Sequence, residues 1–194
     1  MGGILEFDRT VSLWLFEFVR QSPVWLPAAV LAILFVYASA VYLLFLLVNR
    51  STRLLSLKLA LSALVAWQVF SNLIGEFFYR NYGFRDRPFA GEYQELLFEQ
   101  PQKAFPSDHS AFLLTIGFIL MRTYPRAGAV FTALALASGF ARVTIGFHYL
   151  GDVLAGLVIA AGVSWTVIRF EKEIDAFLSR ALRFVGLNGN GPDG

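Results

Sequence analysis

Cysteine is absent from this sequence of 194 residues, and histidine occurs only twice. The lack of cysteine excludes disulfides, thiolate chemistry and cysteine-based zinc sites. Charged residues make up 15% of the chain, against about 25% in an ordinary soluble domain. The net charge is only +2, and no cluster of Lys and Arg follows the pattern of a nucleic-acid-binding surface. We therefore expect no nucleic-acid partner.

Apolar residues are abundant instead, at 57%, and they lie in long runs that predict burial in a lipid bilayer. We expect an all-α fold, a polytopic membrane helical bundle with about five transmembrane helices. It forms one domain, residues 1–186, followed by a disordered tail, residues 187–194, rich in Gly and Asn. The expected spans are residues 24–48, 59–75 with its flanks, 110–121, 127–140 and 149–170, with a polar-faced helix over 171–185.

Residues 5–20 precede the first span and combine apolar positions at helical spacing with Asp8, Arg9 and Glu17. This pattern predicts an amphipathic helix, which lies either on the membrane surface or packed against the bundle. In the fourth span small residues recur every four positions, which predicts a face for close helix packing. They are Ala129, Ala133, Ala137 and Ala141.

The distribution of Lys and Arg predicts the orientation in the membrane. Nine of them fall on one side of the expected spans and seven on the other, and three of the seven are candidates for chemistry. By the positive-inside rule the richer side, with the C-terminus, is cytoplasmic, and the polar segment 80–106 faces outward. The nine are Arg50, Arg53, Lys58, Arg122, Arg126, Arg169, Lys172, Arg180 and Arg183.

Two groups of polar residues flank or interrupt the apolar runs, where each buried polar group is costly enough to mark a functional candidate. The predicted topology brings both groups to the same membrane face. The first group is Arg80, Arg87, Ser107 and His109, and the second is Arg142, His148 and Asp152.

These residue types suit phosphoryl transfer. The guanidinium groups of Arg80, Arg87 and Arg142 match phosphate oxygens in geometry and charge. Ser107, at the predicted start of a helix, can donate a hydroxyl hydrogen bond beside main-chain N–H groups that attract anions. The cluster therefore predicts a phosphate site.

The two histidines suit different steps. His148 and Asp152 are four residues apart at the start of a predicted helix, so they share a face. Asp152 can hold one ring N–H and leave the other nitrogen to attack phosphorus. His109, when protonated, can supply the leaving group with its proton. A zinc site built from the same three residues is the alternative, although it would have few ligands.

The spacing resembles that of the type 2 phosphatidic acid phosphatase superfamily, whose motifs are Lys-x6-Arg-Pro, Pro-Ser-Gly-His and Ser-Arg-x5-His-x3-Asp. The resemblance implies His148 as the nucleophile of a phosphohistidine intermediate, Asp152 as its orienting group and His109 as the acid, with no metal or other cofactor. The departures are Arg80 for Lys, Asp108 for Gly and Ala141 for Ser. The matching segments are Arg80-x6-Arg87-Pro88, Pro106-Ser107-Asp108-His109 and Ala141-Arg142-x5-His148-x3-Asp152.

The Pro-Ser-Asp-His variant resembles the undecaprenyl diphosphatases of the bacitracin-resistance type. This resemblance implies a lipid diphosphate substrate and an active site on the outer face of the cytoplasmic membrane. A phosphatidylglycerophosphate or phosphatidic acid phosphatase remains an alternative, because the motifs do not separate these lipids. A transporter is the more remote one, since the charges gather at one face and no internal repeat is evident.

Two further residues, Glu76 and Arg85, have predicted supporting roles, and Asp108 is predicted to lie at the phosphate site. Glu76 lies four residues before Arg80 and is expected either to pair with it and direct it or to join helices as part of a polar stripe. Asp108 would repel a bound phosphate unless a cation neutralised it. Arg85 could supply that charge and bind the second phosphate of a diphosphate lipid. Alternatively, Asp108 simply occupies the first turn of a helix, where the helix dipole favours it.

Overall fold

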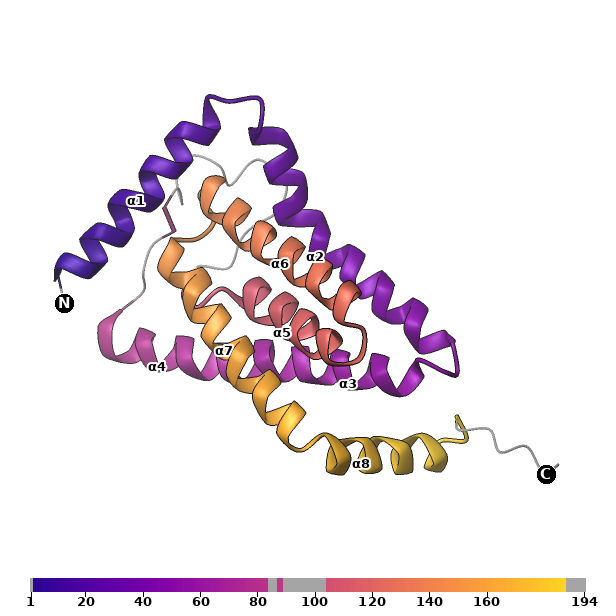
Figure 1. Cartoon of the computed structure of the whole chain (residues 1–194). Coiled ribbons are helices and arrows are strands. Elements are labelled where there is room, and N and C mark those ends of the chain that lie inside the picture. The colour runs from indigo at the N-terminus through magenta and orange to yellow at the C-terminus, as the bar shows by residue number, and fades with distance from the viewer. Residues whose placement is uncertain (1, 84–86, 89–103, 188–194) are drawn as a thin grey trace.

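The computed structural model describes residues 2–83, 87–88 and 104–187, and within these it contains helices and no strand (Figure 1). Most of the predicted tail, and most of the polar segment 80–106, lie outside the described residues. In chain order the elements are α1 (Gly2–Arg20), α2 (Trp25–Val48), α3 (Arg53–Leu64), the π-helical η1 (Val65–Ser71), α4 (Asn72–Tyr82), α5 (Asp108–Thr123), α6 (Pro125–Thr144), α7 (Leu150–Arg169) and α8 (Glu171–Phe184).

The predicted all-α membrane bundle is confirmed. Four helical runs of the described chain are long and apolar enough to cross a bilayer: Trp25–Val48, Arg53–Tyr82, Pro125–Thr144 and Leu150–Arg169. The remaining expected span lies in α5, which has 16 residues and so extends about 24 Å. α5 is enclosed by the other helices rather than exposed to lipid, since ten of its residues are buried.

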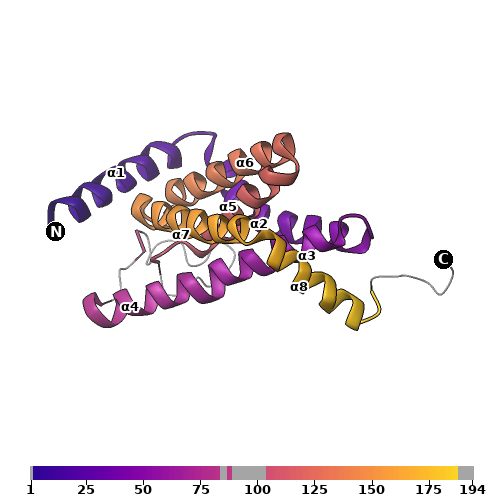
Figure 2. The same ribbon diagram turned by 60° about the horizontal axis from the view of Figure 1, so that its bottom comes forward.

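α5 forms the centre of the bundle and packs against α6, α7 and α3 (Figures 1 and 2). Its turn into α6 is tight, and two glycines allow the helices to meet. A Cβ atom on Gly117 would lie 2.5 Å from Oγ1 of Thr132, and one on Gly128 would lie 2.2 Å from Cα of Met121. Both distances are shorter than any van der Waals contact, so only glycine fits at this crossing.

The predicted alanine face of α6 is wrong for most of its length. Ala129, Ala133 and Ala137 are exposed, whereas Gly128 and Ala135 are buried. Alanines do recur every four residues, but α6 packs against α5 with an adjacent face of the helix. This face carries glycines and hydroxyl groups as well as alanine, so small size alone did not identify it.

The run from Arg53 to Tyr82 contains a seven-residue π-helical stretch, η1, that the sequence pattern did not predict. π-helical turns contain one more residue than α-helical turns and so shift the faces of the helix on either side. η1 packs on α5 and α7, and Trp67 meets Phe112 edge to face at 5.9 Å between ring centroids.

Of the two placements considered for the N-terminal helix, the structure has α1 packed on the bundle, against α6 and α7. Phe16 and Ser12 are buried in this contact, at 0% and 1% exposure. The opposite side of α1 exposes Phe7, Trp14 and Phe18. An apolar exposed face of this kind is compatible with the predicted position at the membrane surface.

At the end of the bundle predicted to be cytoplasmic, a buried lysine joins α3 to α8. The side chain of Lys58 is 6% exposed, and its Nζ lies 2.9 Å from Glu171 Oε1 and 3.0 Å from Asp175 Oδ1. The hydrogen bond from Lys58 lowers the pKa of Glu171, against the opposite effect of burial. This ion-pair network fixes the polar-faced helix that the sequence predicted at the exit of the last span.

Candidate active site

The loop between α6 and α7 folds back on the carbonyl group of Arg142. The N–H groups of Phe147 and His148 donate to this oxygen at 2.9 and 3.2 Å. The reversal passes through Gly146 at φ 79°, a left-handed conformation that favours glycine. The loop therefore sets His148 in a defined position relative to Arg142, which explains the need for fixed spacing between them.

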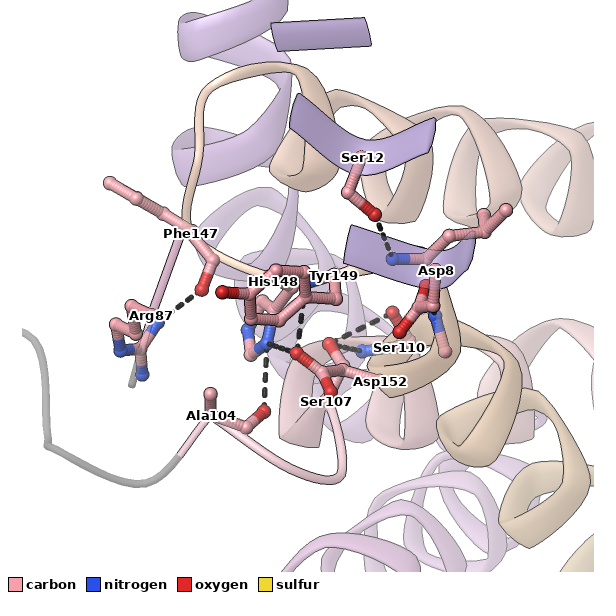
Figure 3. Close-up of polar contacts among 12 residues, drawn as sticks. Asp8, Ser12, Arg87, Ala104, Ser107, Ser110, Phe147, His148, Tyr149 and Asp152 are labelled. Atoms are coloured by element: carbon pink, nitrogen blue, oxygen red, sulfur yellow. Dashed lines mark hydrogen bonds and ion pairs between the residues drawn. The ribbon is translucent and has the colours of Figure 1, made fainter. Parts of the chain in front are cut away.

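The protonated nitrogen of His148 is determined by its surroundings (Figure 3). Its Nδ1 lies 2.9 Å from the carbonyl oxygen of Ala104 and 3.5 Å from Oδ2 of Asp152. Both neighbours are acceptors, so Nδ1 carries the proton, and Nε2 is the nitrogen with the lone pair. His148 is 3% exposed, so the ring is held away from water in a defined orientation.

Asp152 ties three parts of the chain together. Its side chain is 0% exposed, and Oδ2 accepts from the N–H of Tyr149 at 2.9 Å. Its carbonyl oxygen accepts from the N–H of Ser107 at 2.9 Å. The start of α5 is thereby fastened to the first turn of α7. The two sequence motifs that contain Ser107 and Asp152 are joined directly through the backbone.

Ser107 is the N-cap of α5, as predicted, and is fully buried. Its Oγ lies 3.0 Å from Oγ of Ser110 and accepts from the Ser110 N–H at 3.5 Å. α7 approaches this point so closely that a Cβ atom on Gly156 would lie 2.7 Å from the Ser107 carbonyl oxygen. The helix start that faces the site is thus rigidly packed.

Arg142 is buried at 2% exposure, an unusual position for a guanidinium group. Its Nη1 donates to the carbonyl oxygen of Ala32 at 2.9 Å, and its Cζ lies 5.4 Å from the centre of the Phe147 ring. Its Nε has no hydrogen-bond partner among the residues that the structure describes. A buried cationic donor without a partner is costly, and an anion would satisfy it.

Arg87 reaches the same place from the polar segment. Its Nη1 donates to the carbonyl oxygen of Phe147 at 2.8 Å, next to His148 in the chain. Burial holds the pKa of Arg87 below its ordinary value, and the carboxylates of Asp152 and Asp108 act in the opposite direction.

Asp108 and His109 are the first two residues of α5, and both are half-buried. His109 interacts electrostatically with Arg142, His148 and Arg87. Asp108 interacts with Arg87 and Arg142. The structure therefore brings six predicted site residues together around His148, and Ser107 is connected to His148 through Asp152. The six are Arg87, Ser107, Asp108, His109, Arg142 and Asp152.

Arg80 is placed differently. Its side chain is 74% exposed, and its Nε donates to Oε1 of Glu76 at 2.8 Å. The predicted pairing of Glu76 with Arg80 is confirmed, but this arginine is not part of the buried cluster. Arg85 lies outside the described residues, so its pairing with Asp108 stays a prediction. The described residues contain no group of three or more His, Asp or Glu placed to hold a metal ion.

Some residues in the site carried no sequence signal. The carbonyl oxygens of Ala104 and Ala32 form hydrogen bonds with His148 and Arg142. Every residue has a main-chain carbonyl group, so the sequence does not indicate which ones take part. Asp8 and Ser12 of α1 bind the start of α7, more than 130 residues further along the chain. Amphipathicity placed Asp8 on the polar side of its helix without indicating a partner.

The fold and the cluster define a class of protein: a membrane helical bundle in which a buried histidine lies with one buried and one half-buried arginine. A sequence profile for the PAP2 superfamily matches residues 57–175, and the chain belongs to that family. This confirms the resemblance stated above to the type 2 phosphatidic acid phosphatases. The matched region contains every cluster residue of the three motifs.

The chain is similar to undecaprenyl-diphosphatase BcrC of Bacillus subtilis, with 31% identity over 52% of each chain. It is also similar to lipid A 1-phosphatase of Rhizobium johnstonii, with 33% identity over 44% of this chain and 33% of that protein. The alignment spans about half the length of the first of these relatives and a third of the second. Among solved structures, a PAP2-type phosphatidylglycerolphosphate phosphatase from Bacillus subtilis has the same fold, at a TM-score of 0.65 and 18% identity over 90% of this chain and 89% of the other.

Proposed function

We propose that this protein is a membrane lipid phosphatase that removes the terminal phosphate of undecaprenyl diphosphate through a phosphohistidine intermediate. The observation that carries the proposal is the state of His148. Two acceptors face its Nδ1, which leaves Nε2 as a nucleophile beside a buried arginine whose Nε has no partner among the described residues. Membership of the PAP2 superfamily and the similarity to a named undecaprenyl diphosphatase support the choice.

In the first step, Nε2 of His148 attacks the terminal phosphorus atom, and the bond from phosphorus to the bridging oxygen breaks. Nδ1 keeps its proton, so the phosphorylated imidazole ring is positively charged. The Ala104 carbonyl and the Asp152 carboxylate stabilise this charge. The bound diphosphate is negatively charged and offsets the nearby arginines, so that His109 can hold a proton. The lipid monophosphate leaves after its bridging oxygen takes this proton from His109.

In the second step, water attacks the phosphorus atom of the phosphohistidine. His109, now neutral, takes a proton from that water, and the bond from phosphorus to Nε2 breaks. Inorganic phosphate leaves, and both histidines return to their initial states. The same residue therefore acts as acid and then as base, so the cycle needs no further co-reactant than water.

Positive charge around the phosphate comes from side chains in this proposal. Arg142 and Arg87 stabilise the oxygens on which negative charge accumulates, in a site that is already organised before the substrate binds. Their positions are fixed by main-chain carbonyl oxygens of Ala32 and Phe147. Arg80, held by Glu76 near the exposed end of α4, would meet the phosphate only as the substrate arrives.

The preference for a diphosphate rests on Asp108. This carboxylate interacts with Arg87 and Arg142, which partly neutralises it, but it still occupies the position where the family motif has glycine. We propose that Arg85 completes the neutralisation and contacts the second phosphate. The competing interpretation, a first-turn acid stabilised by the helix dipole, fits its place as the first residue of α5.

The proposed location is the cytoplasmic membrane, with the site on the extracytoplasmic face and the C-terminus in the cytoplasm. The support is the distribution of Lys and Arg. The start of α5, with Asp108 and His109, and the α5–α6 turn, next to Arg122 and Arg126, are at opposite ends of α5 (Figure 1).

The proposal is tested by phosphate release from purified protein with three substrates in the same detergent: undecaprenyl diphosphate, phosphatidylglycerophosphate and phosphatidic acid. We expect the highest kcat/KM for undecaprenyl diphosphate, and no release by His148→Ala, which controls for contaminating enzymes. A higher kcat/KM for either glycerolipid would favour the alternative substrates. Release from none of the lipids by the wild-type protein would reject a phosphatase.

A second comparison tests the role of Asp108. Asp108→Gly and Arg85→Ala should each lower kcat/KM for the diphosphate relative to a monophosphate, by about tenfold if one charge-assisted contact of about 1.4 kcal/mol is lost. Equal changes for both substrates would leave Asp108 as a helix-start residue and remove the basis for diphosphate preference.

A further inference from the structure

Two side chains of α1 accept hydrogen bonds from the start of α7, the helix that carries Asp152. Oδ1 of Asp8 accepts from the N–H of Gly151 at 2.9 Å, and Oγ of Ser12 accepts from the N–H of Leu150 at 2.9 Å. Asp8 and Ser12 are four residues apart and so lie on one face of α1. Figure 3 shows both side chains pointing at the first turn of α7.

These contacts complete the hydrogen bonding of the first turn of α7. The first N–H groups of a helix have no acceptor within the helix and need one from elsewhere. Here the consecutive N–H groups of Tyr149, Leu150 and Gly151 are bound by Asp152, Ser12 and Asp8. One acceptor is local, and two come from α1. The helix start is therefore fixed from two directions.

The fit at Gly151 shows how closely the two helices meet. A Cβ atom on this glycine would lie 2.8 Å from Oδ2 of Asp8 and 3.3 Å from its Cγ. The backbone of α7 can approach the carboxylate only because residue 151 has no side chain. The charge of Asp8 also lies at the N-terminal end of α7, where the helix dipole stabilises an anion.

This junction is adjacent to the proposed nucleophile. His148 lies two residues before Leu150, and Tyr149, between them, is held through its N–H by the same Asp152 that faces the imidazole. A shift of the α7 start would move Asp152 and the His148 ring together, away from the arginines on α6 and in the polar segment. Misplacement by about 1 Å can cost an enzyme about a hundredfold in rate.

We propose that Asp8 and Ser12 are positioning residues for His148, and that α1 acts as a brace that holds the nucleophile and its orienting carboxylate in place. The inference rests on the proposed function of His148 and extends the site to a helix that precedes the residues matched by the family profile. Neither side chain contacts the phosphate. Both act through the backbone of α7.

The first test compares kcat with KM. Asp8→Ala and Ser12→Ala should each lower kcat about tenfold and leave KM within about twofold, because the lipid and phosphate contacts remain while the attack geometry is lost. Asp8→Asn, which keeps an acceptor oxygen, should recover most of the rate. Glu17→Ala is the matched control, since Glu17 is an exposed acid on the same helix and should behave as wild type.

A double-mutant cycle tests the contact itself. Gly151→Ala alone should lower kcat, because its Cβ would collide with the Asp8 carboxylate. In the Asp8→Ala background the collision is removed, so adding Gly151→Ala should cost little more. Strict additivity of the two changes would contradict the contact.

Amide hydrogen exchange supplies a readout that does not depend on activity. Asp8→Ala should speed exchange at Gly151, and Ser12→Ala at Leu150, while exchange in α5 stays as in wild type. Slower catalysis with faster local exchange is the expected result. Wild-type exchange in both variants, or faster exchange with wild-type kcat, would each overturn the proposal.

The proposed function and the role of α1 as a brace can be rejected separately. If wild-type protein hydrolyses none of the lipids, the proposed function is rejected. Whether α1 holds the site is then decided by amide exchange at Gly151 and Leu150 and by the affinity for vanadate, a phosphate analogue. Unchanged exchange and unchanged vanadate affinity in Asp8→Ala would then reject the brace as well. If wild-type protein is active and the α1 variants match it in kcat, the inference alone is wrong.

Discussion

The imidazole of His148 is oriented chiefly by the backbone of Ala104, with Asp152 second. Nδ1 lies 2.9 Å from the Ala104 carbonyl oxygen and 3.5 Å from Oδ2 of Asp152, which accepts a hydrogen bond from the N–H of Tyr149 at 2.9 Å. Asp152 therefore fixes the loop and supplies negative charge, and the carbonyl group holds the tautomer. The sequence motif includes Asp152 but does not indicate the backbone carbonyl group of Ala104.

Substitutions of Asp152 should separate these duties. Asp152→Asn keeps an oxygen for the Tyr149 N–H and leaves Ala104 to hold the tautomer, so we expect kcat to fall about tenfold to a hundredfold with little loss of stability. Asp152→Ala also strands the buried Tyr149 N–H, at a cost of about 1–3 kcal/mol, and should lower the melting temperature too. Equal losses of rate and stability in both variants, measured by phosphate release and thermal unfolding, would contradict this division.

Gly156 and Gly162 provide a matched pair on α7. A Cβ atom on Gly156 would lie 2.7 Å from the Ser107 carbonyl oxygen and 2.9 Å from Cβ of Ser110, whereas nothing lies within 4 Å at Gly162. Gly156→Ala should force the start of α5 away from α7 and reduce both stability and kcat, by about 1–3 kcal/mol in stability. Gly162→Ala should be neutral or slightly stabilising. Similar thermal unfolding of the two variants would show that the close approach is not a constraint.

The orientation in the membrane can be read with single cysteines, since the chain has none of its own. Gln21, between α1 and α2, and Ser51, between α2 and α3, are exposed at opposite ends of α2. A membrane-impermeant thiol reagent should label Gln21→Cys in intact cells and Ser51→Cys only after permeabilisation. The reverse pattern would invert the proposed topology and place the site in the cytoplasm.

Metal independence follows from the use of arginine for charge stabilisation. We expect phosphate release to persist in excess chelator, and vanadate to inhibit, because its five-coordinate form resembles the transition state. Arg142→Lys should weaken vanadate inhibition, since an ammonium group cannot replace a buried planar guanidinium group bound to Ala32. Activity lost in chelator and restored by a divalent ion would overturn this part of the account.

Hydrophobic run length predicted the spans well, because a bilayer requires about 20 apolar residues whatever their neighbours are. It did not predict η1, a π-helical stretch that packs against α5 and α7. Nor could it identify the buried face of α6, where Ala133 and Gly139 are both small but only Gly139 is buried. The neighbouring helices decide which stripe faces inward.

Motif spacing predicted the polar side chains of the cluster, because chemistry restricts those positions to particular residue types. It did not predict the backbone acceptors of Ala104 and Ala32, which any residue could provide. The contact between Asp8 and Gly151 joins positions separated by most of the chain, and an acid on an amphipathic helix is ordinarily just a solvated residue. Such long-range contacts become visible only in the folded structure.

His148 carries the phosphate in the proposed mechanism, and trapping the phosphohistidine is the decisive test of it. Substrate with a labelled terminal phosphate should be mixed with enzyme and quenched within one turnover. We predict an alkali-stable, acid-labile label on His148 in the wild-type protein, retained with a good leaving group in His109→Ala and absent from His148→Ala. Label on the His148→Ala protein, or phosphate release by it, would contradict the account.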